Sequence, residues 1–138
     1  MEWNPGQFGL ERRKPMAWDL DSDRPIYAQL VERLQVQIVS GYYPPGGKLP
    51  SVRELASVAA VNPNTMQKAF AELERGGLIN TQRTNGRTVT EDTELIQSVK
   101  LGLAKGHIET FVSRMKELGY TEKEILSLLE TTGGKKYE

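Results

Sequence analysis

The sequence predicts a mainly helical protein with one small β-hairpin. Three observations support this fold class. Apolar residues recur every three or four positions in several stretches, which is the period of a helix buried on one side. Two residue pairs have the spacing of a helix capping box. Only one stretch, 79–90, combines β-forming residues with a hairpin turn signal.

The composition limits the classes of protein and of site. The chain has 138 residues, of which 38% are hydrophobic and 26% charged, as in an ordinary globular domain with an appendage. No apolar run approaches the ~18 residues of a membrane helix, so we expect no membrane partner. There is no cysteine, which excludes disulfides and thiolate metal sites and suits the cytoplasm. With one histidine and no paired carboxylates, we expect neither an enzyme nor a cofactor.

The charges are unevenly distributed along the chain. Basic and acidic side chains number 18 each, so the formal net charge is zero. Residues 24–90, however, carry 8 basic and 4 acidic side chains, a net of +4. Residues 1–23 carry 3 and 5, and residues 91–138 carry 7 and 9, which is a net of −2 for each. A basic middle segment fits a polyanionic partner, because the local charge of the contacting face matters more than the total.

The first predicted helix follows a stretch without pattern. Residues 1–15 have no apolar period, so we expect a flexible leader there. Pro25 suits the first turn of a helix, and Gly41 its end. Between them the spacing of four, three and four residues predicts one apolar face, formed by Tyr27, Val31, Leu34 and Ile38. The segment 41–50 holds three prolines and three glycines and is predicted to be a loop.

Two short helices come next, each with a start signal. Ser51 and Glu54 form a capping box, in which each side chain binds a free backbone N–H at the helix start. Asn62 is the expected cap of the second helix, with Pro63 in its first turn and a glycine pair at its end. The two buried stripes are Val52, Leu55, Ala56 and Ala59 in the first helix, and Met66, Ala69, Phe70 and Leu73 in the second.

Two helices joined by so tight a turn predict a helix-turn-helix. The following segment INTQRTNGRTVT has β-forming residues around Asn85–Gly86, the strongest signal for a two-residue hairpin turn. A hairpin directly after a helix-turn-helix is the wing of a winged helix. We therefore expect a winged helix-turn-helix domain over residues 16–90.

The second helix of this motif has a polar outer face near its start. In helix-turn-helix proteins these N-terminal residues enter the major groove of DNA. Asparagine and glutamine can bond adenine, lysine suits guanine or phosphate, and free N–H groups at the helix start attract phosphate. The candidate contacts on this helix are Asn62, Asn64, Thr65, Gln67 and Lys68.

Arginines supplement this face. Arg53 lies in the first turn of the preceding helix, from which a long cation can reach a phosphate or a base. Arg83 and Arg87 flank the wing turn, and Gly86 allows a close backbone approach. A wing tip of this kind can reach the neighbouring minor groove.

Each of these features also has a purely structural explanation. Side chains such as Gln67 and Lys68 on a helix exterior are usually only solvated, and asparagines can serve as caps alone. Arg53 could form a surface ion pair with Glu54 or Glu72. A winged helix can also be a protein-interaction module without DNA binding, but exposed Leu, Phe or Tyr would then be expected in place of the polar side chains. The order of the elements favours the DNA-binding interpretation.

The C-terminal region is predicted to be helical. Residues 93–118 carry an apolar stripe that is too broad for one small domain to cover, and Thr121–Glu124 is a second capping box. The two half-sites of a helix-turn-helix operator lie about 34 Å apart, so two DNA-binding domains must be held at that distance by a dimer. We expect a dimerisation segment over 91–132, with a disordered tail at 133–138. The candidate interface residues are Ile96, Val99, Leu103, Ile108, Phe111, Val112 and Met115. The alternative is that this helix packs on its own winged domain.

Two stretches resemble a known family. PPGGKLPSVRELA at 44–56 and VNPNTMQKAFAELERGGLI at 61–79 strongly resemble the GntR family of bacterial transcription regulators. The resemblance spans roughly 25–90, and the short C-terminal region resembles that of the YtrA subfamily, which dimerises through two helices. The resemblance implies a homodimeric, sequence-specific repressor that binds a palindromic operator in double-stranded DNA, often that of a transporter operon.

The family pattern also implies site residues. It places DNA contacts on Arg53, Asn62, Asn64, Thr65, Gln67, Lys68, Asn85 and Gly86, and Ser51 matches the family's cap. One departure lies in the turn between the two helices, where the family often has glycine and this chain has Ala60. A left-handed turn conformation would be strained at an alanine.

Overall fold

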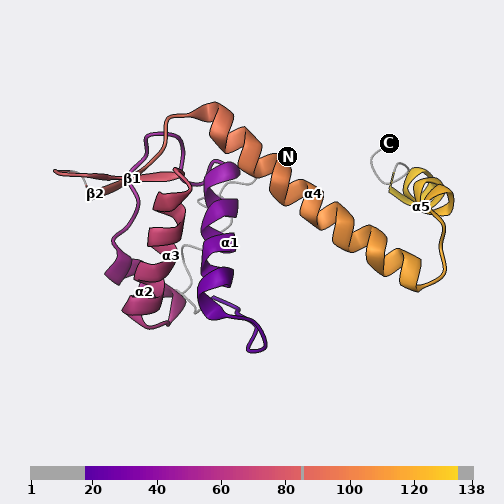
Figure 1. Ribbon diagram of the computed structural model, residues 1–138, viewed down its shortest axis with the longest axis horizontal. Coiled ribbons are helices and arrows are strands. Elements are labelled where there is room, and N and C mark those ends of the chain that lie inside the picture. Colours follow the sequence, from indigo (N-terminus) through magenta and orange to yellow (C-terminus); the bar gives the residue numbers. More distant parts are fainter. Residues whose placement is uncertain (1–17, 85, 134–138) are drawn as a thin grey trace. The chain divides into compact units, whose positions relative to one another are not determined.

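The computed structural model describes residues 18–84 and 86–133 (Figure 1). The leader predicted at 1–15 and the tail predicted at 133–138, apart from Gly133, lie outside this part of the chain. The elements are, in order, α1 (Ile26–Val39), α2 (Val52–Ala59), α3 (Pro63–Arg75), β1 (Ile79–Gln82), β2 (Gly86–Val89), α4 (Thr93–Glu117), α5 (Glu122–Leu128) and the π-helical turn η2 (Leu129–Gly133). The predicted fold class, mainly helical with one hairpin, is confirmed.

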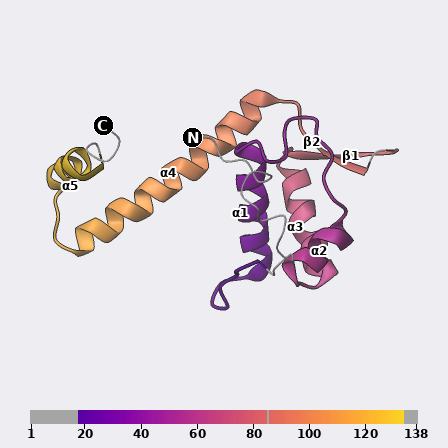
Figure 2. The same ribbon diagram turned by 180° about the vertical axis from the view of Figure 1, so that it is seen from behind.

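The chain divides into two compact units, Met1–Val99 and Lys100–Glu138. In the first unit α1 and α3 lie side by side, α2 packs against α3, and the hairpin follows the end of α3 (Figures 1 and 2). One apolar core joins these elements. Its most deeply buried large side chains are Phe70, Leu30, Leu34, Ile38, Met66, Ile79 and Val89.

Helix α1 differs from its prediction in two respects. Pro25 is the residue just before the helix and not part of its first turn. The buried stripe includes Leu30 and Gln29, whereas Tyr27 and Val31 are only half-buried. Gln29 is 5% exposed. Its side-chain amide accepts from the backbone N–H of Asp21 at 2.7 Å and donates to the carbonyls of residues 21 and 24 at 2.8 and 3.1 Å. A buried amide is tolerated here because its hydrogen bonds are satisfied.

The hairpin is antiparallel, with Ile79 opposite Val89 and Gln82 opposite Gly86. Gly86 is therefore the first residue of β2, and its φ is +73°. Three residues separate the two strands, so the prediction of a two-residue turn at Asn85–Gly86 is wrong. Asn85 itself lies outside the described residues. The predicted loop 41–50 also pairs with β2. Leu49 N–H donates to the Arg87 carbonyl, and Val89 N–H donates to the Gly47 carbonyl, each at 2.9 Å.

The first turns of α4 belong to the core of the first unit. Ile96 is 5% exposed and lies in that core, and Val99 and Leu95 pack against it. At Gly77, an added Cβ would lie 3.3 Å from the Leu95 side chain. Two residues of the predicted dimer surface, Ile96 and Val99, are thus covered by their own chain. For this part of α4, the alternative prediction, that the helix packs on its own winged domain, is therefore the correct one.

The second unit contains the rest of α4 and α5. Gly119, with φ +100°, follows the end of α4, and Thr121 and Glu124 form the predicted capping box at the start of α5. Ile125 is buried in this unit. No helix in residues 18–84 and 86–133 has the length and apolarity needed to cross a membrane.

Candidate nucleic-acid interface

The start of α2 is fixed by the predicted capping box. The Ser51 hydroxyl accepts from Glu54 N–H at 3.0 Å, and a Glu54 carboxylate oxygen accepts from Ser51 N–H at 2.9 Å. The Ser51 hydroxyl is therefore engaged with Glu54 in the cap. The box also fixes the first turn of α2, where Arg53 lies.

The same contacts keep Glu54 ionised. Its pKa is lowered, mainly by the backbone hydrogen bond from Ser51, then by the bond from the Ser51 side chain, and least by the nearby charge of Lys48. A carboxylate is stabilised at a helix start because it accepts from free N–H groups there.

The turn between α2 and α3 passes through a left-handed residue. Ala60 has φ 61° and ψ 47°, and its N–H and that of Val61 donate back to carbonyls of α2 at 3.2 and 3.0 Å. These bonds end α2 and turn the chain into α3 within three residues. An alanine in this conformation costs roughly 1–2 kcal/mol relative to the right-handed region.

Helix α3 begins as predicted. The Asn62 side chain accepts from the N–H of Asn64 at 2.7 Å, and Pro63 is the first helical residue. The side-chain oxygen of Asn62 is therefore used by the cap, which leaves its NH₂ group to donate to a ligand. Asn62 and Asn64 are both exposed.

The two faces of α3 differ sharply in exposure. The inner face is buried and apolar, and comprises Met66, Ala69, Phe70 and Leu73. Gln67 and Lys68 on the outer face are exposed, and Thr65 is half-buried. The ammonium of Lys68 lies 4.5 Å from the ring centroid of Tyr27 on α1. The amides and the lysine thus point away from the core, as an interface with DNA requires.

Arg53 is exposed at the start of α2 and forms no ion pair with any residue that the structure describes. The two acidic partners suggested by the sequence are occupied elsewhere, since Glu54 binds Ser51 and Glu72 pairs with Arg75. The positive charge of Arg53 therefore remains available for an anion.

The two wing arginines have different environments. Arg83 is exposed in the connection between the strands. Arg87 is half-buried, with its guanidinium carbon 5.2 Å from the ring centroid of Phe70 and its Nε 3.7 Å from a carboxylate oxygen of Glu74. The sequence expectation treated the two alike, but only Arg83 extends freely toward solvent.

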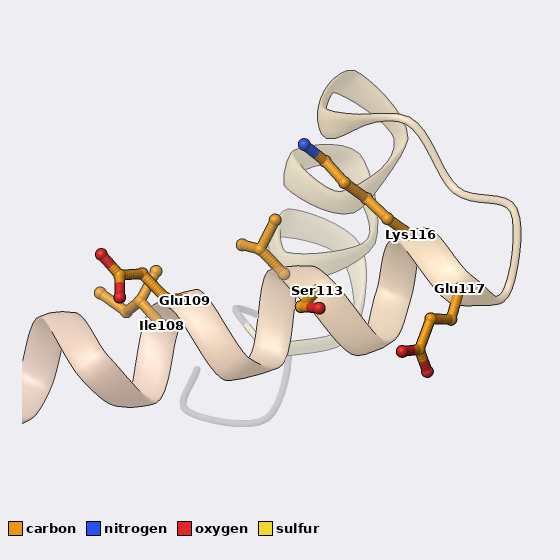
Figure 3. A pocket seen from close by; sticks show the side chains of 6 residues that line it. Ile108, Glu109, Ser113, Lys116 and Glu117 are labelled. Atoms are coloured by element: carbon orange, nitrogen blue, oxygen red, sulfur yellow. The ribbon is translucent and has the colours of Figure 1, made fainter.

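The second unit presents the remaining candidate residues. Leu103, Val112 and Met115 are partly buried, while Ile108 and Phe111 are 59% and 39% exposed. A hollow of about 620 Å³ runs along α4 from Ile108 to Glu117, where Lys116 and Glu117 point in opposite directions (Figure 3). A second, apolar groove of about 610 Å³ lies between α4 and α5, lined by His107, Ile108, Phe111, Val112, Glu122, Ile125, Leu126 and Leu129.

Sequence reasoning missed two features of this interface. Tyr27, which holds Lys68, was expected only as a core residue of α1. Arg87 and Glu74, which pair across 13 positions, share no local spacing that would have identified them.

Comparison with known proteins gives consistent results. The model of the GntR family of bacterial regulatory proteins matches residues 26–89. The chain is 41% identical to the uncharacterised HTH-type transcriptional regulator YhcF of Bacillus subtilis, over 80% of this chain and 91% of that protein. It is 39% identical to the HTH-type transcriptional repressor YtrA of the same organism, over 72% of each.

Solved structures agree. A GntR family transcriptional regulator from Listeria monocytogenes superposes with a TM-score of 0.75 at 41% identity, covering 82% of this chain and 99% of that one. The DNA-binding domain of AraR in complex with its operator ORX1 gives a TM-score of 0.52 at 25% identity, covering 56% and 100%. By its sequence, and over most of the length of these relatives, the chain belongs to the GntR family of bacterial regulatory proteins.

Proposed function

We propose that this member of the GntR family of DNA-binding transcription regulators is a homodimeric repressor, which reads a palindromic operator with the outer face of α3. It would act in the bacterial cytoplasm, where its operator lies. The observation that carries this proposal is the division of α3 into a buried apolar face and an exposed face of amides and Lys68. Such a helix can lie in a major groove without disturbing the core beneath it.

The charges support the same partner. Among the residues that the structure describes, Arg24, Arg75 and Arg87 are paired with carboxylates of their own unit. Lys68 and Arg53 remain outside ion pairs in that part of the chain and lie on the helix-turn-helix itself. The basic excess of residues 24–90 is thus available to phosphates, and phosphate contacts supply much of the affinity of DNA-binding proteins.

The repressor and operator assignments draw on the relatives. YtrA is named a repressor, and the AraR domain was solved with operator DNA. The alternative, a protein-interaction module that does not bind DNA, gains no support from α3. Gln67 and Lys68 occupy the exposed positions where such a module would carry apolar side chains.

Dimerisation is supported by the second unit. Its exposed large apolar side chains include Leu101, Ile108, Phe111, Leu126 and Leu129. Ile108, Phe111, Leu126 and Leu129 line one groove, and a large exposed apolar patch usually marks a protein interface. A second copy of the chain is the partner that a palindromic operator requires, because two-fold symmetry in the DNA mirrors two-fold symmetry in the protein.

Selection of bound sequences from a pool of random DNA duplexes tests the proposal. We expect enrichment of an inverted repeat with half-sites about one DNA turn apart. A single half-site would contradict the homodimer. Failure to enrich any sequence, at a salt concentration low enough for non-specific binding to be seen, would contradict sequence-specific reading.

A further inference from the structure

Glu74 contacts both strands of the wing from the end of α3. The hydroxyl of Thr81 on β1 donates to one of its carboxylate oxygens. The Nε of Arg87 on β2 lies 3.7 Å from the other oxygen. One carboxylate of α3 therefore contacts both strands of the hairpin at the opposed pair Thr81 and Arg87, near the turn.

Arg87 completes this arrangement by covering the core. Its guanidinium lies over the ring of Phe70, which is fully buried on the inner face of α3. The side chains of Arg87 and Glu74 are only 25% and 30% exposed. The Nε of Arg87 is shielded from solvent and has no hydrogen-bond partner in the described part of the chain, so its contact with Glu74 is an ion pair and not a hydrogen bond. A guanidinium can lie flat on an aromatic ring while the N–H groups in its plane face a carboxylate, whereas a lysine ammonium has no plane with which to adopt this geometry.

We propose that Glu74 and Arg87 are positioning residues, which fix the angle of the wing relative to the recognition helix α3. A two-stranded hairpin is only marginally stable by itself. The core anchors this hairpin at Ile79 and Val89, so the direction of its turn end depends on contacts such as those of Glu74 and Arg87. Arg83 is then the wing cation that reaches the DNA, and Arg87 is not. This inference rests on the proposed DNA-binding function and concerns how the same surface is arranged.

The substitutions Glu74→Gln and Glu72→Gln in the full chain distinguish this role from a simple charge effect. Both remove one negative charge from α3, which by itself favours DNA binding. With the duplex selected by the wild-type protein, we expect Glu72→Gln to bind at least as tightly as wild type. We expect Glu74→Gln to bind about tenfold more weakly, within the range measured for coupled networks. If Glu74→Gln binds as tightly as Glu72→Gln, the proposal is wrong.

Arg87→Lys keeps the positive charge but cannot reproduce the stacked pair. We expect it to weaken binding about as much as Glu74→Gln while the salt dependence stays that of wild type. Arg83→Gln should reduce the salt slope by about one, as the loss of one phosphate contact does. Wild-type affinity in Arg87→Lys would show that its charge alone matters and would overturn the proposal.

A spectroscopic measurement tests the arrangement without DNA. In the NMR spectrum of the free wild-type protein, the Nε–H proton of Arg87 should exchange slowly and be shifted by the Phe70 ring. In Glu74→Gln, at a temperature where circular dichroism shows the helices intact, the shift and the protection should be lost. If they persist, Glu74 does not position Arg87. A wild-type protein that selects no duplex would refute the proposed function, while this measurement would still decide on the pair.

Discussion

At the scale of single residues, the orientation of Lys68 depends on an aromatic ring of α1. Its ammonium lies 4.5 Å from the Tyr27 ring centroid, a distance at which a cation–π attraction orients the side chain but leaves N–H groups free. We infer that α1 thereby presents Lys68 to the DNA. The structure thus gives a reason why a flexible lysine can serve as a defined contact.

We predict that Lys68→Ala weakens operator binding about tenfold, because a hydrogen bond to a charged group contributes about 1.5 kcal/mol. If the contact is to a phosphate, the salt slope should also fall by about one. Fluorescence anisotropy with the selected duplex over a salt series measures both. Lys105→Ala removes the same charge from an exposed position on α4 and is the control. Equal affinities of the two variants would remove Lys68 from the interface.

Ala60 is the residue at which the backbone is strained. We predict that Ala60→Gly stabilises the protein by about 0.5–1 kcal/mol, because the relief of a left-handed alanine exceeds the entropy that glycine adds to the unfolded chain. Ala59→Gly makes the same chemical change one position earlier, at a buried helical residue, and should destabilise by about 1 kcal/mol or more. Urea unfolding measures both, and a destabilised Ala60→Gly would show that the alanine is not strained.

At the scale of elements, the start of α2 depends on pH through Glu54. Its pKa in the folded protein is lowered below the ordinary value of 4.5, chiefly by the N–H of Ser51. Its ionised form therefore stabilises the fold fully above 4.5, and this contribution is lost as the pH falls through the lowered pKa.

We predict that wild type loses more stability than Glu54→Gln as the pH falls from neutral to below that pKa, because glutamine does not titrate. Urea midpoints over the pH series give the comparison. Ser51→Ala, which removes the hydroxyl cap, should cost about 1 kcal/mol at neutral pH. Parallel curves for wild type and Glu54→Gln would contradict a role of this carboxylate in acid sensitivity.

The elements that could be predicted from the sequence are those determined by local spacing. The caps at Ser51 and Asn62 bind N–H groups two or three residues away, so the pattern alone revealed them. The buried face of α1 was missed in part because Gln29 is buried by hydrogen bonds to residues 21–24, which hydrophobic periodicity does not register. The orientation of Arg87 was missed because its partners lie on α3. The DNA contacts themselves stay predictions.

At the scale of the whole molecule, the proposed homodimer depends on the exposed apolar face of the second unit. Phe111 lines the groove between α4 and α5. The neighbouring Thr110 lies on a different side of α4, because successive residues of an α-helix are rotated by about 100°. We predict that Phe111→Glu converts a dimer into a monomer, because a buried unpaired charge is costly, and that Thr110→Glu does not. Light scattering gives the masses. A wild-type monomer, or a dimeric Phe111→Glu, would contradict the proposed interface.

The burial of Ile96 and Val99 has a practical consequence for anyone who wishes to study the DNA-reading half in isolation. A shortened gene product that stops at Thr90, where the hairpin is complete, would leave part of the core uncovered and would tend to aggregate. A product that continues through Val99 keeps the first two turns of α4, which cover the core. The natural place to cut this chain therefore lies inside a helix and not in the loop that precedes it.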